Sequence, residues 1–151
     1  MLASAESTLS GVSRETAERL QLYHDLLLKW QKQINLVAPS TVSEAWPRHF
    51  ADSTQLAPLI TTGPDLVDFG SGAGFPGLVL AIMNADGPLE NVHLVESNGK
   101  KAAFLRTVVR ETGLGGTAMN VTVHNERGEA VTGQLRQPHW STARALSSLS
   151  D

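Results

Sequence analysis

The 151-residue chain contains no cysteine. This absence excludes a disulfide framework, a thiolate metal site and a cysteine nucleophile. The five histidines are scattered, and no two of them have a spacing typical of metal ligands. The sequence therefore predicts a protein without a resident metal ion.

Long apolar runs are also absent, as is a basic N-terminal stretch followed by an apolar block. We therefore expect neither a membrane span nor a secretory signal peptide. The composition is 41% apolar and 18% charged, which is typical of a folded domain. These features predict a cytoplasmic protein that makes no membrane contact, and we expect a monomer.

The net charge of −3 does not by itself indicate a nucleic-acid-binding protein. Positive charge is nevertheless concentrated in one short segment without an acidic residue, at Lys100, Lys101, Arg106 and Arg110. This segment is either a face that contacts phosphates or an ordinary solvated helix surface.

Residues 1–62 are predicted to form a small helical cap. Apolar residues recur at spacings of three and four between residues 13 and 37, which indicates one amphipathic helix that ends before Pro39. A second helix is expected from Pro47 to about Ile60, with a kink or an early end at Pro58.

Strands alternate with helices in residues 63–151. The predicted strands are 66–69, 92–96, 121–123 and 141–146, and the predicted helices are 76–84, 99–112 and 129–135. This order indicates an α/β fold with a doubly wound parallel sheet. Because the last strand would be an unprotected edge, we expect that the chain is truncated at its C-terminus and that this domain is incomplete.

A glycine-rich segment, Asp68-Phe69-Gly70-Ser71-Gly72-Ala73-Gly74, directly follows the first predicted strand. Its glycines permit a tight turn and the close approach of a ligand, and the helix that begins near Pro76 is expected to direct free N–H groups at that ligand. The Asp68 carboxylate suits the amine of a methionine moiety, directly or through water, and would repel a pyrophosphate. The glycine pattern of nicotinamide and flavin folds fits poorly here, because it would begin at Gly72, two residues too far from the strand. The segment therefore favours S-adenosylmethionine (SAM).

Two further features fit this cofactor. Glu96 ends the second predicted strand, where an acidic residue accepts hydrogen bonds from both ribose hydroxyls in dinucleotide and SAM folds alike. Alone, it is equally an ordinary solvated carboxylate. Arg127-Gly128-Glu129 follows the third predicted strand, where such folds read adenine, although an arginine and a glutamate are also common together in surface loops.

Several stretches together are more specific than each alone. They are Tyr23-x-x-Leu26-Leu27-x-Lys29-Trp30 with Ile34-Asn35-Leu36, Arg48-His49-x-x-Asp52-Ser53, Asp68 to Gly77 with its Pro-Gly ending, and Glu96-Ser97-Asn98-Gly99-Lys100-Lys101 with Phe104-Leu105. With these stretches the sequence resembles the bacterial small-subunit rRNA guanine-N7 methyltransferases of the glucose-inhibited division protein B family. The chain has Gln31, Glu96 and Gly128 where that family more often has Asn, Asp and a small side chain.

The resemblance implies a class I SAM-dependent methyltransferase with a Rossmann-like fold, acting on guanine N7 of 16S rRNA in the small ribosomal subunit or its precursor. It implies SAM contacts by Gly70, Phe75, Gly128, Glu129 and Arg144, which join the motif residues Asp68, Gly72, Gly74 and Glu96. It also implies that His49, Asp52, Ser53 and Lys100 surround the entrance of the site, to which we add Arg48 and Lys101 as cations that can contact RNA phosphates.

Guanine N7 has a free lone pair and no proton, so no catalytic general base is expected. His49, Asp52 and Ser53 have the spacing of one helix face and either orient the guanine or form a buried polar hinge. Two other functions remain open at this point. One is a SAM-dependent methyltransferase of a small molecule or a protein, and the other is an inactive SAM-binding fragment.

Overall fold

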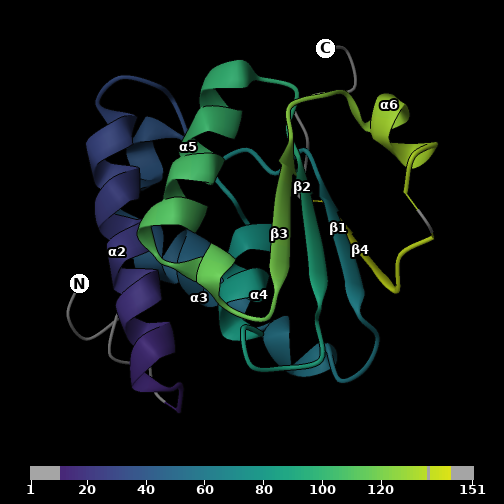
Figure 1. Ribbon diagram of the computed structural model, residues 1–151. Coiled ribbons are helices and arrows are strands. Elements are labelled where there is room, and N and C mark those ends of the chain that lie inside the picture. Colours follow the sequence, from purple (N-terminus) through teal and green to yellow (C-terminus); the bar gives the residue numbers. More distant parts are fainter. Residues whose placement is uncertain (1–10, 136, 144–151) are drawn as a thin grey trace.

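In the computed structural model of the protein, residues 11–135 and 137–143 are described. A single sheet forms the centre of the fold, and all of its strands are parallel, in the order β3-β2-β1-β4 (Figure 1). The strands are β1 (Asp65–Phe69), β2 (Asn91–Val95), β3 (Asn120–His124) and β4 (Trp140–Ala143). The predicted α/β fold class and the parallel sheet are therefore confirmed.

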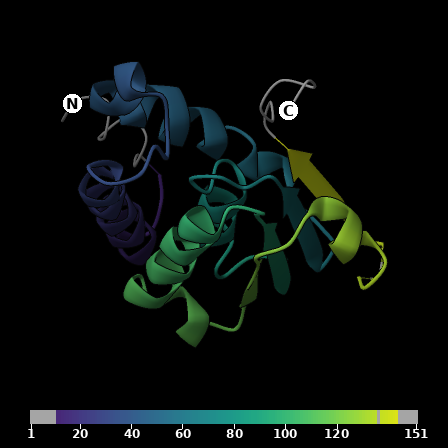
Figure 2. The same ribbon diagram turned by 90° about the horizontal axis from the view of Figure 1, so that it is seen from above.

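Helices lie on both faces of the sheet. The helices α4 (Gly77–Met83) and α5 (Gly99–Glu111) cover one face, and α2 (Arg14–Gln31) packs against both of them from outside. The short helix α6 (Gly128–Thr132) lies on the other face, where Val131 packs against Val67 and Val95. Figures 1 and 2 both show α2 and α5 on the opposite side of the sheet from α6.

The first helix is shorter than predicted, because α2 ends at Gln31 instead of near residue 37. The Gln31 side-chain amide accepts hydrogen bonds from the N–H groups of Leu36 and Val37, both at 3.1 Å, and donates one to the carbonyl of Val37 at 2.9 Å. These bonds fold the following segment back onto the helix end. The apolar residues after Gln31 therefore continue the helical spacing without being helical.

The second predicted helix, Pro47 to Ile60, is wrong in its form. Residues 39–60 instead contain a 3-10 turn, η1 (Pro39–Glu44), a π-helical turn, η2 (Trp46–Phe50), a short α-helix, α3 (Ala51–Thr54), and a second 3-10 turn, η3 (Ala57–Leu59). The π turn is closed by the N–H of Ala51, which donates to the carbonyl of Trp46. Trp46 and Phe50 of the π turn and Ser53 of α3 are buried, so these elements still bury one face although their winding is irregular.

One apolar core joins the N-terminal helices to the sheet. Leu20 and Leu27 of α2 belong to the same cluster as Leu78 and Leu80 of α4, and all four side chains are fully buried. In α4 every residue from Gly77 to Ile82 is buried, because the helix lies between the sheet on one side and α2 and α3 on the other.

Candidate functional site

The glycine-rich turn lies where parallel α/β sheets usually bind ligands. All four strands point the same way, so their carboxyl ends meet at one edge of the sheet. The chain continues from β1 to β2 on one side, whereas β4 pairs on the other side of β1. The turn that follows β1 therefore lies at the reversal in strand order, which is the preferred binding crevice of this fold class.

Three glycines of the turn have left-handed backbone angles, with φ of 64° at Gly70, 56° at Gly72 and 100° at Gly74. Residues with side chains rarely adopt these angles, so the turn requires glycine. A Cβ atom at Gly72 would meet only the carbonyl oxygen of Gly70, at 3.8 Å, so this side of the turn is open. A Cβ atom at Gly74 would instead overlap the hydroxyl of Tyr23. The peptide bond between Phe75 and Pro76 is cis.

The Asp68 carboxylate has a different role from the one expected. It is fully buried, and its oxygens accept hydrogen bonds from the hydroxyls of Ser71, at 2.8 Å, and Thr142, at 2.9 Å, and from the N–H of Gly77, at 3.1 Å. These bonds tie the end of β1 to both ends of the turn and to β4. No part of the Asp68 side chain is exposed, so a direct contact with a ligand amine is not available in this arrangement, whereas the contact through water that we also expected stays a prediction.

The expectation of free N–H groups at the start of α4 is also wrong. Four N–H groups in the turn and at the start of α4 are bonded within the protein, at distances of 2.7 to 3.1 Å. The N–H of Ser71 donates to the carbonyl of Val95, and the N–H of Gly74 to the carbonyl of Ser71. The N–H of Gly72 donates to the carboxylate of Glu96, and the N–H of Gly77 to that of Asp68. A pyrophosphate site needs such N–H groups unpaired. The turn is therefore poorly suited to a dinucleotide.

Glu96 follows β2 and lies beside the open side of the turn. One carboxylate oxygen accepts the N–H of Gly72 at 2.7 Å, and the other accepts the N–H of Asn98 at 2.8 Å. Each oxygen of a carboxylate can accept a second hydrogen bond, so the pair keeps capacity for the two hydroxyls of a ribose. The two backbone bonds hold the carboxylate in one orientation next to Gly72.

Phe75 lies in an aromatic cluster that connects the turn to the N-terminal helices. Its ring is 3% exposed and stacks with Tyr23, with ring centroids 5.6 Å apart, and with His49, at 5.1 Å. Phe50 meets it edge-on at 5.0 Å. The Phe75 ring therefore packs the turn against the N-terminal helices, and the SAM contact expected of Phe75 stays a prediction.

The expected substrate residues of the second N-terminal segment do not share one face. Ser53 is buried, whereas Asp52 is exposed, because Ser53 belongs to the buried face of that segment. His49 is half-buried, and its Nε2 atom lies 3.0 Å from the hydroxyl of Thr41. Arg48 is exposed and paired with Glu44 at 2.7 Å.

Lys100 and Lys101 lie in the first turn of α5, next to the candidate cofactor site. The Asn98 side chain caps this helix by accepting the N–H groups of both lysines at 3.0 Å, while the backbone of Asn98 bonds to Glu96. Among the described residues neither lysine forms an ion pair. These two cations are therefore close to the turn and available to a ligand.

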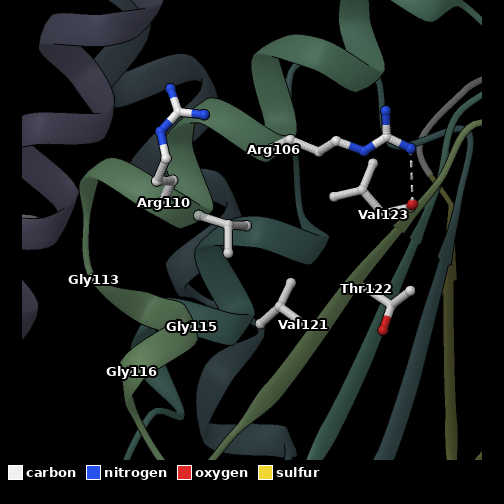
Figure 3. Close-up of a pocket in the computed structure, with 9 residues that line it drawn as sticks. Arg106, Arg110, Gly113, Gly115, Gly116, Val121, Thr122 and Val123 are labelled. Carbon is white, nitrogen blue, oxygen red and sulfur yellow. Dashed lines mark hydrogen bonds between the residues drawn. The ribbon is translucent and has the colours of Figure 1, made fainter.

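Arg106 and Arg110 lie in a different place. They line a shallow groove of about 520 Å³ between α5 and the edge strand β3 (Figure 3). Arg106 Nη2 donates to the carbonyl of Val123 at 3.3 Å, and Arg110 pairs with Glu111 at 3.5 Å. The positive segment recognised in the sequence is thus divided between two sites.

The predicted adenine-side residues follow β3. Gly128 begins α6, and a Cβ atom there would lie 3.3 Å from the ring of Phe69, the last residue of β1. Glu129 is exposed in the first turn of α6. Gly70, Gly72, Glu96 and Gly128 therefore all lie at the carboxyl edge of the sheet. Arg144 lies outside the described residues.

Sequence reasoning missed Tyr23, Ser71 and Thr142 as residues that shape the turn. Tyr23 donates its hydroxyl to the carbonyl of Ala73, and the other two bond to Asp68. Ser71 could have been suspected from its place between the glycines. The contacts of Tyr23 and Thr142 have no local signal, because they join positions far apart in the chain.

The described part of the chain contains no group of three or more His, Asp or Glu residues that could hold a metal ion. Within the same residues, no helix has the length and apolar character that a membrane crossing needs.

Comparison of the amino-acid sequence with known proteins identifies one family. The model of the family described as rRNA small subunit methyltransferase G matches residues 16–151. The chain is 60% identical over 125 residues to the ribosomal RNA small subunit methyltransferase G of Paramagnetospirillum magneticum, covering 82% of this chain and 57% of that protein.

Two further relatives carry the same name. Identity is 53% over 143 residues with the protein of Rhodospirillum centenum, covering 93% of this chain and 60% of the relative. It is 47% over 148 residues with that of Brucella anthropi, covering 98% and 67%. The chain thus spans 57% to 67% of the length of these three relatives. It belongs to the rRNA small subunit methyltransferase G family.

Proposed function

We propose that this protein is a SAM-dependent methyltransferase that methylates N7 of a guanine in 16S rRNA of the small ribosomal subunit or its precursor, in the cytoplasm. The observation that carries the proposal is the turn after β1, in which the N–H groups of Gly72 and Gly77 are held by the carboxylates of Glu96 and Asp68 while its open side lies beside Glu96. The names of the relatives support the substrate.

The chemistry of the turn fits SAM better than a dinucleotide. The carboxylate of Glu96 can accept the two ribose hydroxyls next to Gly72, which has no side chain to obstruct them. Glu96 and Asp68 lie near the turn and would repel a pyrophosphate. When bound, SAM supplies a methyl group on a positively charged sulfur, which is readily attacked by a lone pair.

The residues of this chain need only to bind and align the reactants. Guanine N7 attacks with its own lone pair and loses no proton, so no side chain has to act as a base. Holding N7, the methyl carbon and the sulfur in line is a proximity effect, which can supply about 7–11 kcal/mol. We assign cofactor contacts to Gly70, Gly72, Glu96, Gly128 and Glu129, and we extend them to Arg144.

RNA would approach over the first turn of α5. Lys100 and Lys101 are cations beside the cofactor site, and His49 and Asp52 lie on the neighbouring N-terminal segment. Guanine N7 lies on the major-groove edge, which A-form RNA buries, so the target guanine is expected in a loop or irregular region. With few free cations and a net charge of −3, a folded ribosomal particle is a better substrate than naked RNA.

The proposal is tested with labelled SAM and small ribosomal subunits. Calorimetry first measures SAM binding by the chain, and transfer of the labelled methyl group is then followed into RNA nucleosides. Label in 7-methylguanosine supports the proposal. Label only in protein or small metabolites would favour the alternative substrates, and SAM binding without transfer would favour an inactive SAM-binding fragment.

A further inference from the structure

We propose that Tyr23 is a positioning residue for the glycine-rich turn, and that its hydrogen bond to Ala73 sets the affinity for SAM. The proposal rests on the proposed function, because it assigns a role toward the same cofactor. Tyr23 lies in α2, 50 residues before Ala73 in the chain, and its side chain is fully buried.

The bond joins an N-terminal helix to the middle of the turn. Tyr23 donates its hydroxyl to the carbonyl of Ala73, the residue between Gly72 and Gly74. A Cβ atom at Gly74 would overlap this hydroxyl, so the glycine leaves the space that the tyrosine fills. The turn and α2 are therefore complementary in shape as well as hydrogen-bonded.

The phenol ring is held from several sides. It stacks with Phe75, with the ring planes inclined by 13°, and it meets Phe50 edge-on with ring centroids 4.9 Å apart. Phe104 of α5 lies beside it at 6.2 Å. Because these contacts come from the turn, the π turn and α5, the hydroxyl has little freedom to move and the bond costs little further ordering.

Two bonds therefore hold adjacent residues of the turn, Gly72 and Ala73, through different peptide groups. Tyr23 holds the carbonyl of Ala73, and Glu96 holds the N–H of Gly72 at 2.7 Å. Loss of the first bond releases the turn on the side of α2 and lets Gly72 move relative to Glu96. The carboxylate that is expected to accept the ribose would then lose its fixed relation to the open side of the turn.

The first test compares Tyr23→Phe with the wild-type chain by calorimetry with SAM. The phenylalanine ring preserves the stacking and removes only the hydroxyl. We expect the dissociation constant for SAM to rise about fivefold to tenfold, because one buried hydrogen bond is lost. The matched control is Thr112→Val, which removes a buried 2.6 Å hydrogen bond to Val108 in the last part of α5, away from the turn, and should leave SAM binding unchanged.

A second measurement uses the fact that the chain contains a single tyrosine. Incorporation of 3-fluorotyrosine places one fluorine label at Tyr23, and its NMR resonance should shift on addition of SAM with the same dissociation constant as calorimetry gives. Hydrogen exchange provides a readout without ligand: the Gly74 amide should exchange faster in Tyr23→Phe than in the wild type, and no faster in Thr112→Val.

The outcomes separate the two proposals. If the wild-type chain binds SAM but Tyr23→Phe binds it equally well, or if the fluorine resonance does not respond to bound SAM, the positioning role of Tyr23 is refuted and the proposed function stands. If Tyr23→Phe lowers only the melting temperature, Tyr23 is merely structural. Failure of the wild-type chain to bind SAM would overturn the proposed function and the assignment of Tyr23 with it.

Discussion

At the scale of single residues, two carboxylates near the turn have different surroundings. Asp68 is fully buried and binds two hydroxyls and one backbone N–H, all from the protein. Glu96 is 8% exposed and binds two backbone N–H groups beside the open side of the turn. Both acidic positions were recognisable in the sequence, but their different hydrogen-bond partners were not. Thr142, for example, reaches Asp68 only once β4 has paired with β1.

Replacement of Glu96 by alanine should weaken SAM binding by about 1–3 kcal/mol, because it removes an acceptor for the ribose and releases two backbone N–H groups. Calorimetry measures the change. Glu90→Ala, an exposed carboxylate just before the other end of β2, is the control and should bind SAM normally. An unchanged affinity in Glu96→Ala would show that this carboxylate does not hold the cofactor.

Gly77→Ala should destabilise the protein by about 2 kcal/mol or more, because the new Cβ atom would overlap the buried carboxylate of Asp68. Gly116→Ala is the matched control, since a Cβ atom there meets nothing within 4 Å. Urea denaturation compares the free energies of unfolding of both variants. Equal stabilities would mean that Asp68 can move away without cost.

At the scale of elements, the hydrophobic periodicity of the sequence predicted those helices and strands whose ends are set by neighbouring residues. The four strands lie within one or two residues of their expected ends wherever the structure describes them. Apolar residues mark β1, β2 and β3 in the sequence, whereas β4 has Ser141 and Thr142 at its centre. The N-terminal elements were harder to predict. The end of α2 depends on the hydrogen bonds between the Gln31 side chain and the backbone of Leu36 and Val37. The π turn at Trp46–Phe50 keeps its apolar residues on one buried face, so its sequence pattern does not differ from that of an α-helix.

The edge strand β3 provides a prediction at this scale. The N–H of Asn120 and the carbonyl of His124 form hydrogen bonds on the side of β2. Because successive residues of a parallel strand bond to opposite sides, the N–H and carbonyl of Val123 face away from β2. Arg106 donates a hydrogen bond to this carbonyl and covers it. Arg106→Ala should uncover this edge and increase self-association with concentration, measured by light scattering. Arg110→Ala, in the same groove but paired with Glu111, should scatter like the wild type; equal scattering of both variants would deny Arg106 this protective role.

At the scale of the whole molecule, the location of the site was predictable and its internal bonding was not. The acid-glycine motif and strand order were sufficient to place the turn at the carboxyl edge of the sheet. The pairing of its N–H groups depends on Glu96 and Asp68 at the ends of neighbouring strands, and the packing of Phe75 against Tyr23 and His49 arises only when the N-terminal helices cover the turn. Contacts between segments far apart in the chain cannot be predicted from the hydrophobic periodicity of a single sequence.

Stability should fall on mild acidification. Burial lowers the pKa of His24 and His93 below the ordinary value of 6.5, and His124, whose Nε2 atom lies 2.9 Å from Nδ1 of His93, lowers the pKa of His93 further. The unfolded chain therefore binds more protons than the folded one below about pH 6.5, so the free energy of unfolding decreases from there toward the lower folded pKa values.

Urea denaturation at about pH 7.5 and about pH 5.5 measures this decrease. In His93→Gln the decrease should be smaller, because one of the two groups is removed. His139→Gln, which replaces an exposed histidine, is the control and should behave like the wild type. A decrease of the same size in all three proteins would contradict the assignment to His93.

The burial of α4 on all sides also governs the order in which the molecule can fold. The N-terminal helices leave the ribosome first, yet Leu20 and Leu27 belong to a buried cluster that includes α4, so this cluster cannot be completed until α4 has been synthesised. Conversely, a chain that begins at residue 63 would expose the outer side of α4 to water. We expect such a chain to aggregate instead of folding, as size-exclusion chromatography and circular dichroism would reveal; a monomeric, folded product would instead make residues 63–151 an autonomous domain. If the shortened chain aggregates, the sheet needs the helical cap in order to fold.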